Sequence, residues 1–219
     1  MIKRLFDLLL SSIALTVIFP FLGIIYPLVK FDSPGPFFFR QKRMGLHNRI
    51  FRIFKIRTMH TGAENDGDLQ SGITINNDPR VTRIGRFLRK TKLDELPQFI
   101  NVWLGHMSIV GPRPELPRYR DVNPEQWDEI LSVRPGITEN ASLEYFNEER
   151  LLTDDEIADD VYRREILPVK QQLYLDYVKY RSFFTDIKII LRTLKRIVFS
   201  VPQNPESRGN AEHKKMDAP

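Results

Sequence analysis

An uncharged run of 22 residues near the N-terminus, LLLSSIALTVIFPFLGIIYPLV at 8–29, constrains the fold more than any other feature of the chain. As one straight helix it would be roughly 33 Å long, enough to cross the hydrocarbon core of a bilayer. The run exceeds a normal signal-peptide core, and no small-x-small cleavage site follows it. We therefore expect the segment to stay attached to the chain.

Pro20 lies near the centre of this run. Because proline removes a backbone hydrogen bond and clashes with the preceding turn, we expect a kink that leaves two arms of about 11–12 residues. Each arm would cross about half of the hydrocarbon core. Cations flank both ends, with Lys3 and Arg4 before and Lys30 after. The positive-inside rule would keep both flanks cytosolic if the segment turns back. A re-entrant segment and a kinked single span remain open, and both leave the bulk of the chain in the cytosol.

The charge of the chain indicates anionic partners. A net charge of +5 and a pI near 9.4 suit nucleic acid, a membrane surface or phosphorylated small molecules. Residues 1–60 hold ten Lys and Arg against two acids, whereas residues 139–165 hold ten acids against three bases. This segregation favours a membrane-proximal face and a phosphate site, and no nucleic-acid-binding signature is found, so no nucleic-acid partner is expected.

Cysteine and histidine usage limits the chemistry further. There are no cysteines, which excludes disulfides and thiolate metal sites. The four histidines are scattered without helical ligand spacing, so we expect no histidine metal site.

Local patterns predict a hairpin and helices after the apolar run. DSPGP at 32–36 predicts a turn, and the partly alternating runs PFFFRQKR and RIFRIFKIR, separated by MGLHN, predict a β-hairpin. Residues 61–78 are polar and rich in Gly and Asn, which indicates a loop that is either a substrate lid or without a role. A helical period of apolar residues begins at Val81, and Pro97 marks a kink or a new helix start.

The C-terminal third is predicted to be helical up to a tail. Residues 151–165 resemble an acidic surface helix. Residues 167–199 have apolar residues at helical spacing with Lys and Arg between them, which fits either an interfacial amphipathic helix or a terminal helix packed on the core. Residues 201–219 lack apolar content and are expected to be disordered.

The stretch RKTKLDELPQ at 89–98 places Asp94 and Glu95 directly after a run of six cations without an acid. One interpretation is structural, since Thr91-x-x-Asp94 matches a capping box and acids stabilise a helix N-terminus. The other is chemical. Adjacent carboxylates on a helix point about 100° apart, so they cannot flank a glycosidic bond. One carboxylate could instead attack a phosphorus atom, because the preceding cations would offset the repulsion between two anions.

The stretch GPRPE at 111–115 sets Arg113 between Pro112 and Pro114. The prolines restrict the backbone and so present a guanidinium with little freedom, as bidentate phosphate binding favours. Taken alone, such a loop is usually a rigid turn.

Five stretches occur in a characteristic order around the Pro-broken apolar run: KRLFD, DSPGPFFFRQKRMG, FRIFKIRTM, DPRVTRIGRFLRKTKLDELPQFINVWLGHMSIVGPRPE and VRPGIT. Together they resemble the bacterial sugar transferases known as monotopic phosphoglycosyl transferases, of the small, single-domain type. The resemblance implies transfer of a phospho-sugar from a UDP-sugar to a polyprenyl phosphate, with release of UMP. It also implies a covalent aspartyl-phosphosugar intermediate, which the lipid phosphate then attacks.

Carried over residue by residue, the resemblance makes Asp94 the nucleophile and Glu95 its partner, with a positioning or acid–base role. Mg²⁺ is expected to bridge the diphosphate and Asp94. The resemblance further implies that phosphate or nucleotide is contacted by residues of three motifs, namely Arg89, Arg113 with Pro112, and Lys55 with Arg57.

The fold implied by the resemblance is a mostly helical α+β monotopic membrane protein. It has an N-terminal re-entrant helix–break–helix at 1–31, a cytosolic-face catalytic domain at 32–200 with interfacial amphipathic helices and a small β-hairpin, and a disordered tail at 201–219. The break lies at Pro20. The expected location is the bacterial inner membrane, with membrane lipids as neighbours and the catalytic domain on the cytoplasmic face.

Three departures from the family pattern are Phe19 before the breaking proline, His106 in GHMS, and ENASLEYFNEE after RPGIT. The resemblance links the last of these segments to sugar choice, so the identity of the sugar is not carried over from the family. Two alternatives to the enzyme remain: a non-enzymatic membrane adaptor and a metal-dependent nucleotide-sugar hydrolase.

Overall fold

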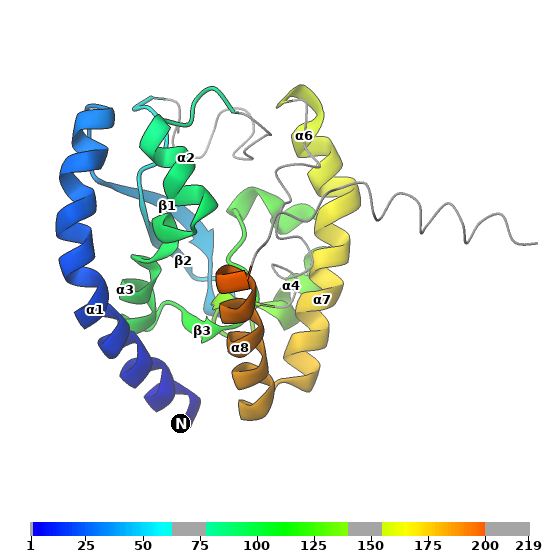
Figure 1. Ribbon diagram of the computed structural model, residues 1–219. Coiled ribbons are helices and arrows are strands. Elements are labelled where there is room, and N and C mark those ends of the chain that lie inside the picture. Colours follow the sequence, from blue (N-terminus) through cyan, green and yellow to red (C-terminus); the bar gives the residue numbers. More distant parts are fainter. Residues whose placement is uncertain (1, 63–77, 140–154, 200–219) are drawn as a thin grey trace, which may run out of the picture.

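The computed structural model describes residues 2–62, 78–139 and 155–199 of the chain (Figure 1). As predicted in outline, these residues form a mostly helical α+β fold with a long N-terminal apolar helix and small two-stranded sheets. The elements in chain order are α1 (Ile2–Asp32), β1 (Phe38–Met44), η1 (Leu46–Asn48), β2 (Ile50–Ile56), α2 (Arg83–Lys90), η2 (Leu93–Glu95), α3 (Gln98–Trp103), β3 (Ser108–Val110), η3 (Pro117–Asp121), α4 (Pro124–Ile130), β4 (Gly136–Thr138), α6 (Asp155–Val161), η5 (Tyr162–Ile166), α7 (Leu167–Tyr180) and α8 (Phe183–Phe199).

Three predicted segments lie wholly or mainly outside the described residues. They are the loop at 61–78, the segment ENASLEYFNEE at 139–149 and the tail at 201–219. The predicted domain boundaries likewise stay predictions.

Helix α1 is continuous over 31 residues and contains both Pro20 and Pro27. Pro20 does not divide it into two separate arms as predicted; Figure 1 shows one helix that bends along its length. The physical reason is that a proline removes a single backbone hydrogen bond, and the bonds on either side are sufficient to continue the helix. This helix is long and apolar enough to cross a membrane, with a mean hydropathy of 2.5 in its most apolar window.

The N-terminal end of α1 is bonded to the rest of the protein. The Lys3 ammonium donates to the carbonyl of Val110 (3.0 Å) and pairs with Asp186 Oδ2 (2.5 Å). The Arg4 guanidinium donates to the carbonyl of Val102 (2.6 Å). The two cations that were expected to act as a topology signal therefore also attach α1 to β3, α3 and α8.

Carboxylates near both ends of α1 also bond this helix to the rest of the protein. Asp7 is buried and accepts hydrogen bonds from Ser108 Oγ (2.9 Å) and the Ile109 N–H (3.0 Å). At the other end, Asp32 Oδ2 accepts from the N–H of Ile84, at the start of α2 (2.8 Å). Helix α1 is thus held at each end by the same body, and it runs alongside that body in Figure 1.

Strands β1 and β2 form the predicted antiparallel hairpin, with Phe38 opposite Ile56 and Met44 opposite Ile50. The hairpin is fastened to α3 by the buried side-chain amide of Asn101. This amide accepts from the N–H of Phe54 (2.9 Å) and donates to the carbonyl of Arg52 (2.8 Å). Helix α3 therefore has a defined position against β2.

Helix α2 begins after Thr82, whose hydroxyl accepts a hydrogen bond from the N–H of Gly85 (2.9 Å). Its first turn lies close to the end of β2, since the Thr82 N–H donates to the carbonyl of Thr58 (2.9 Å). A Cβ on Gly85 would lie 2.0 Å from that same carbonyl oxygen, so the approach requires glycine. The helix predicted from Val81 is confirmed, as is a new helix start at Pro97, which is the N-cap of α3.

Strands β3 and β4 form a short parallel pair that joins the GPRPE and VRPGIT stretches. Ser108 pairs with Gly136 and Val110 pairs with Thr138. The two backbones approach so closely that a Cβ on Gly136 would lie 2.1 Å from the nitrogen of Gly111. The chain needs glycine on both sides of this contact.

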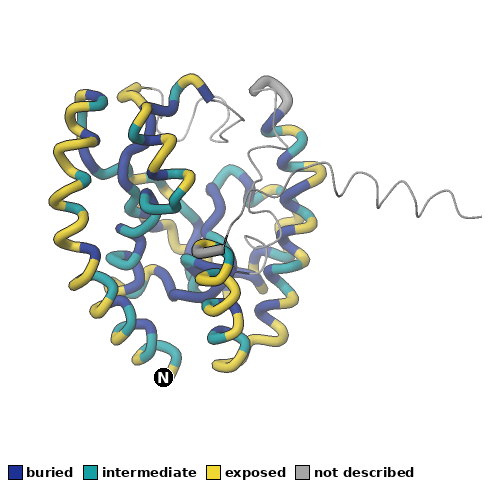
Figure 2. Tube along the Cα trace, in the orientation of Figure 1, coloured by how far each residue is buried: buried dark blue, intermediate teal, exposed yellow. Residues whose placement is uncertain are grey.

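The segment at 167–199 forms two helices rather than one, because α7 ends at Tyr180 and α8 begins at Phe183. Helix α7 buries Tyr174 and Tyr177 in the core, so the core-packed interpretation is confirmed for it. Helix α8 instead leaves apolar side chains exposed, and Figure 2 shows exposed residues along α8 and along the outer side of α1.

Candidate active site

The Asp94–Glu95 pair lies on η2, between the end of α2 and the start of α3. Lys92, directly before η2, has φ 57° and ψ 17°, a left-handed conformation that is uncommon for a residue with a side chain. The capping-box prediction is wrong, because Thr91 is the C-cap of α2 and its hydroxyl donates back to the carbonyl of Phe87 (2.8 Å). A tight left-handed turn, rather than an N-terminal cap, therefore presents the pair.

Asp94 is buried, with 6% of its surface exposed. Its Oδ1 atom is buried and has no hydrogen-bond partner among the residues that the structure describes. Burial raises the pKa of this carboxyl, Lys55 opposes the shift, and the neighbouring Glu95 adds to it. Burial therefore favours the neutral acid at Asp94, and the cations around it favour the ionised form. A carboxylate with a free, desolvated oxygen is suited to nucleophilic attack.

Glu95 is held by two cations. Its Oε1 atom accepts from Lys55 Nζ (2.9 Å) and from Arg113 Nη2 (3.1 Å). Burial alone would raise the pKa of Glu95, but Lys55 and Arg113 hold it well below its usual value. Glu95 is therefore ionised at neutral pH, which favours the positioning role over the acid–base role that the sequence left open.

Lys55 and Arg113 come from different parts of the chain and meet at Glu95. Lys55 lies on β2, where burial lowers its pKa and Glu95 opposes that shift. Arg113 follows β3, and Glu95 raises its pKa well above the usual value. The backbone N–H of Arg113 donates to Glu139 Oε2 (3.1 Å), and the carbonyl of Pro112 accepts from Gly136 (2.8 Å). The structure thus brings four predicted residues together: Asp94, Glu95, Lys55 and Arg113.

Arg89 and Arg57 have different surroundings. The Arg89 Nε donates to Thr58 Oγ1 (2.8 Å), and its charge lowers the pKa of Asp94, which places it near the pair. Arg57 is buried and donates to the carbonyl of Ser33 (2.6 Å) in the turn after α1. That contact gives Arg57 a structural function, and its proposed phosphate contact stays a prediction.

Sequence reasoning missed a buried polar cluster behind the Arg113 loop. Glu115 accepts from the hydroxyls of Tyr162 (3.0 Å) and Tyr174 (3.1 Å), and Lys170 Nζ lies 3.5 Å from it. Burial alone would raise the pKa of Glu115, but Lys170 and Arg43 lower it below its usual value. The signal available in the sequence was Glu115 itself in GPRPE, but its partners lie about 50 residues away on η5 and α7.

The residues present fit a Mg²⁺ ion that is shared with a substrate. No group of three or more His, Cys, Asp or Glu gathers among the described residues, so the protein offers no complete ligand cage within those ranges. The Asp94 carboxylate, which is not fully occupied by hydrogen bonds, can supply one ligand. Mg²⁺ commonly takes one or two carboxylates together with phosphate oxygens, so this donor set is adequate if a diphosphate supplies the rest.

Comparison with known proteins shows the family of the chain. The family model described as "Bacterial sugar transferase" matches residues 1–200. The chain belongs to the bacterial sugar transferase family.

Three relatives illustrate the similarity. The chain is 42% identical over 205 residues to an "Undecaprenyl-phosphate glucose phosphotransferase" of Komagataeibacter xylinus, covering 90% of this chain and 36% of that protein. It is 36% identical over 204 residues to a "UDP-N-acetylgalactosamine-undecaprenyl-phosphate N-acetylgalactosaminephosphotransferase" of Aeromonas hydrophila, covering 90% and 44%. It is 34% identical over 199 residues to a "UDP-glucose:undecaprenyl-phosphate glucose-1-phosphate transferase" of Caulobacter vibrioides, covering 90% and 69%. The chain thus spans less than half the length of the first two relatives.

Proposed function

We propose that this protein transfers a sugar-1-phosphate from a UDP-sugar to undecaprenyl phosphate, releases UMP and so initiates the assembly of a bacterial polysaccharide. The observation that carries the proposal is the buried Asp94 with a free Oδ1 atom, beside a Glu95 that is ionised and paired with two cations. Family membership and the substrates in the relatives' names support the same reaction.

In the first half-reaction, Asp94 Oδ1 attacks the sugar-side phosphorus of the UDP-sugar. A bond forms between this oxygen and phosphorus while the bond from phosphorus to the bridging oxygen breaks, and UMP leaves with that oxygen. The attack requires the ionised carboxylate, and Lys55, Arg89 and Lys92 favour that form because each lowers the pKa of Asp94. The same cations reduce the repulsion between the carboxylate and the diphosphate.

Glu95 contributes to the reaction by holding two cationic side chains in place. Through Oε1 it orients Lys55 and Arg113, whose remaining N–H groups can donate to phosphate oxygens. Asp94 would hold Mg²⁺ together with oxygens of the substrate, and the ion would offset negative charge on the phosphate groups. Arg113 is further fixed by its backbone bond to Glu139, so its guanidinium is presented with little freedom.

In the second half-reaction, an oxygen of undecaprenyl phosphate attacks the phosphorus of the aspartyl-phosphosugar. The bond to Asp94 breaks, the carboxylate is regenerated, and the product is the undecaprenyl diphosphosugar. Since the relatives' names include both glucose and N-acetylgalactosamine, the sugar is assigned here only as a UDP-linked hexose or hexosamine.

A re-entrant or interfacial position of α1 is the membrane arrangement that we propose. Lys3, Arg4 and Asp7 bond one end of α1 to the catalytic body, and Asp32 bonds the other end to α2. A helix that crossed the bilayer away from a cytosolic body would have one end beyond reach of that body. This arrangement keeps the body at the cytoplasmic face, where a lipid-linked phosphate is accessible.

Purified protein incubated with a UDP-sugar alone tests the reaction. We expect UMP release of about one equivalent and a phosphosugar adduct in the intact-mass spectrum, both absent in Asp94→Asn. A non-enzymatic adaptor would release no UMP with any UDP-sugar. A nucleotide-sugar hydrolase would instead release UMP continuously without a lipid acceptor, at the rate seen with one.

Single cysteines test the membrane arrangement, because the native chain has none. Ile2 and Phe31 are 75% and 90% exposed and lie at opposite ends of α1. Cysteines at both positions should react with an impermeant maleimide from the cytoplasmic side of inverted membrane vesicles. Protection of one position on that side would support a single span instead.

A further inference from the structure

Lys170 is a charged residue that the fold buries on α7, on the side of the molecule opposite α1 (Figure 1). Only 2% of its surface is exposed. Its ammonium donates to the hydroxyl of Tyr162 (3.0 Å) and lies 3.5 Å from Glu115 Oε1. Burying an ammonium is costly unless it is paired and hydrogen-bonded. The interior therefore holds a paired charge to which the proposed reaction, as described so far, assigns no role.

Glu115 connects this charge to the loop that carries Arg113. Its Oε1 atom also accepts from the hydroxyls of Tyr162 (3.0 Å) and Tyr174 (3.1 Å), and both tyrosines are buried. Tyr162 begins the π-helical turn η5, and such turns are rare and occur frequently at functional sites. A buried ion pair is often no more stabilising than apolar side chains of similar volume. Stability alone therefore does not account for this concentration of polar side chains behind the loop.

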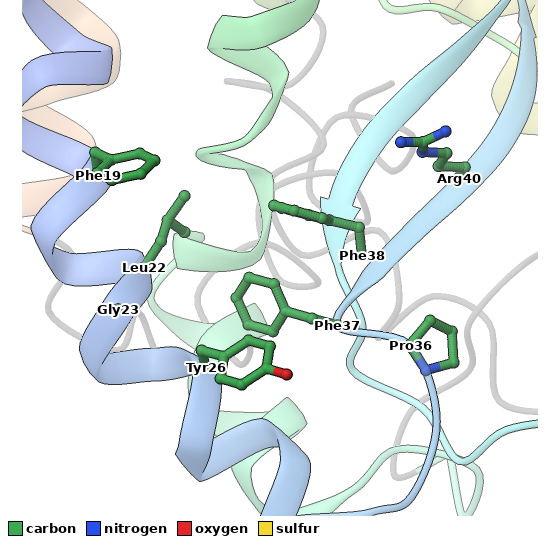
Figure 3. A pocket seen from close by; sticks show the side chains of 8 residues that line it. All are labelled: Phe19, Leu22, Gly23, Tyr26, Pro36, Phe37, Phe38 and Arg40. Atoms are coloured by element: carbon green, nitrogen blue, oxygen red, sulfur yellow. The ribbon is translucent and has the colours of Figure 1, made fainter.

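Strand β1 supplies a second set of contacts to the same loop. Near the start of this strand Arg40 lines an open apolar groove beside α1 (Figure 3), whereas Arg43 near its other end contacts the loop. Arg43 Nη1 donates to the carbonyl of Pro114 (3.1 Å). The N–H of Met44 donates to the carbonyl of Glu115 (2.9 Å). Glu115 is thus held through its backbone by β1 and through its side chain by η5 and α7.

The position of Arg113 depends on this anchor. Its backbone N–H donates to Glu139 Oε2 (3.1 Å), and its guanidinium donates to Glu95 Oε1 (3.1 Å). Prolines precede and follow Arg113, so the backbone has little freedom to absorb a shift of its neighbours. Glu115 follows only two residues later. A displacement of the Glu115 carboxylate would therefore move the loop and, with it, the Arg113 guanidinium.

We propose that Lys170, together with Tyr174, is a positioning residue for the transfer reaction: it holds Glu115 and so orients the Arg113 guanidinium toward the diphosphate of the UDP-sugar. The inference rests on the proposed transfer reaction and adds residues of α7 to the groups on which that reaction depends. A displacement of about 1 Å caused by a change far from the chemistry can cost roughly a hundredfold in rate. Support from a helix that does not touch the substrate is therefore sufficient to affect catalysis.

Lys170→Met in the full-length protein tests this role, because methionine is unbranched like lysine and removes the charge. The kcat/KM of adduct formation from UDP-sugar should fall by roughly tenfold or more, mainly through a higher KM, since a misplaced Arg113 binds the diphosphate less well.

The matched control is Gln171→Met. Gln171 is the next residue on α7, is also fully buried, and is bonded to Val122 and Asn123 rather than to the Arg113 loop. This variant also loses buried hydrogen bonds, so denaturant unfolding should show a loss of stability in it, but its KM for UDP-sugar should equal that of wild type. A wild-type KM in folded Lys170→Met, or an equal rise in Gln171→Met, overturns the proposal.

A kinetic double-mutant cycle with Arg113→Ala shows whether Lys170 acts through Arg113. If it does, Lys170→Met should lower kcat/KM no further in the Arg113→Ala protein. Equal fold losses with and without Arg113 overturn the proposal, because Lys170 would then support the fold in general rather than this side chain.

Tyr174→Phe provides the second variant, which decides the matter if Lys170→Met does not fold. It removes one hydroxyl from Glu115, so the KM for UDP-sugar should rise by roughly threefold, as for the loss of one hydrogen bond. An unchanged KM in folded Tyr174→Phe overturns the assignment. If wild type itself forms no adduct, the transfer reaction and the positioning role fall together; an adduct in wild type with no effect of these variants removes the positioning role alone.

Discussion

Asp94 and Glu95 are consecutive residues whose pKa values are shifted in opposite directions. Burial raises the pKa of Asp94, whereas Lys55 and Arg113 outweigh burial and hold the pKa of Glu95 well below its usual value. The two pKa shifts differ because the carboxylates have different hydrogen-bond donors. Glu95 Oε1 accepts from two charged donors, whereas Asp94 Oδ1 has no donor among the described residues. One carboxylate of the pair is therefore committed to structure, and the other is left reactive.

The raised pKa of Asp94 predicts the pH dependence of the first half-reaction. The attacking form is the carboxylate, so the rate should fall as pH drops through the raised pKa, above the ordinary value of about 4 for aspartate. Rapid-quench measurement of adduct formation with saturating UDP-sugar checks this. Thermal unfolding at each pH serves as the control for loss of fold. A rate that stays constant down to about pH 4 would contradict the assignment.

Asp94→Asn should separate activity from stability. The pKa of Asp94 is higher in the folded protein than in the unfolded chain, so the unfolded chain binds fewer protons at a pH between the two values. Above the pKa in the folded protein Asp94 is ionised, and its buried charge lowers the stability of the fold. The neutral amide removes this cost. We expect no adduct and a gain of roughly 1 kcal/mol in the free energy of unfolding at pH 7, as for other reactive-site replacements. A loss of stability in denaturant unfolding would show that Asp94 is a structural group.

Local pattern was sufficient to predict several elements of the fold. The hairpin follows from alternation, α2 from a helical period, and the start of α3 from Pro97, since each signal lies within a few residues of the element that it specifies. The nucleophilic role of Asp94 was inferred from a motif that sets this carboxylate directly after a run of cations, and it stays a prediction.

Contacts over long sequence separations could not be predicted in this way. In the sequence, Lys3 and Asp7 are polar residues that precede an apolar run. Their hydrogen-bond partners lie about 100 or more residues further along the chain. Thr91 matched a capping box by spacing alone, and the left-handed backbone at Lys92 ends α2 there instead. Glu115 belongs to the GPRPE stretch, but no sequence pattern connects it to its tyrosine partners on η5 and α7.

The ion pairs at Glu95 should be strongly coupled. Glu95→Gln leaves the partly buried Lys55 and Arg113 without their common anion, so we expect a loss of about 3 kcal/mol in the free energy of unfolding. This stabilisation is present above the usual pKa of glutamate and is lost as pH falls through the depressed value. Denaturant unfolding at pH 7 measures the loss.

A double-mutant cycle with Lys55→Met isolates the interaction energy between Glu95 and Lys55. The Glu95→Gln/Lys55→Met protein should be less destabilised than the sum of its single variants, by roughly 1–2 kcal/mol. Additive effects within about 0.5 kcal/mol would indicate that the 2.9 Å contact contributes nothing to stability.

The close contact between β3 and β4 predicts a strong effect of a single methyl group. In Gly136→Ala the new Cβ would lie 2.1 Å from the nitrogen of Gly111, so the strands must separate. We expect a loss of about 3 kcal/mol in stability, because this contact is between backbones and cannot be relieved by a side-chain rotation. Adduct formation should also fall, since the carbonyl of Pro112 accepts from Gly136 and positions Arg113.

The control for this variant is Gly23→Ala, where the added Cβ has open space around it among the described residues. An alanine there should be neutral or stabilise α1 by up to about 1 kcal/mol. Equal losses of stability in the two glycine variants would refute the role assigned to the close approach.

Asp7 tests whether α1 is part of the catalytic body rather than a separable anchor. Its carboxylate accepts from Ser108 Oγ and from the Ile109 N–H, and it is 3% exposed. Asp7→Ala leaves both donors buried without a partner, so we expect a loss of about 2–3 kcal/mol in the free energy of unfolding in detergent. Because β3 leads directly into the Arg113 loop, the kcat for transfer should fall as well.

Leu9→Ala is the matched control, since Leu9 lies on the same helix, is 64% exposed and is about 200° around the helix axis from Asp7. It should alter vesicle binding with little change in unfolding or in kcat. If Asp7→Ala behaves like Leu9→Ala in unfolding and in kcat, the N-terminal helix is an anchor only, and the hydrogen bonds to Ser108 and Ile109 do not connect it to the active site.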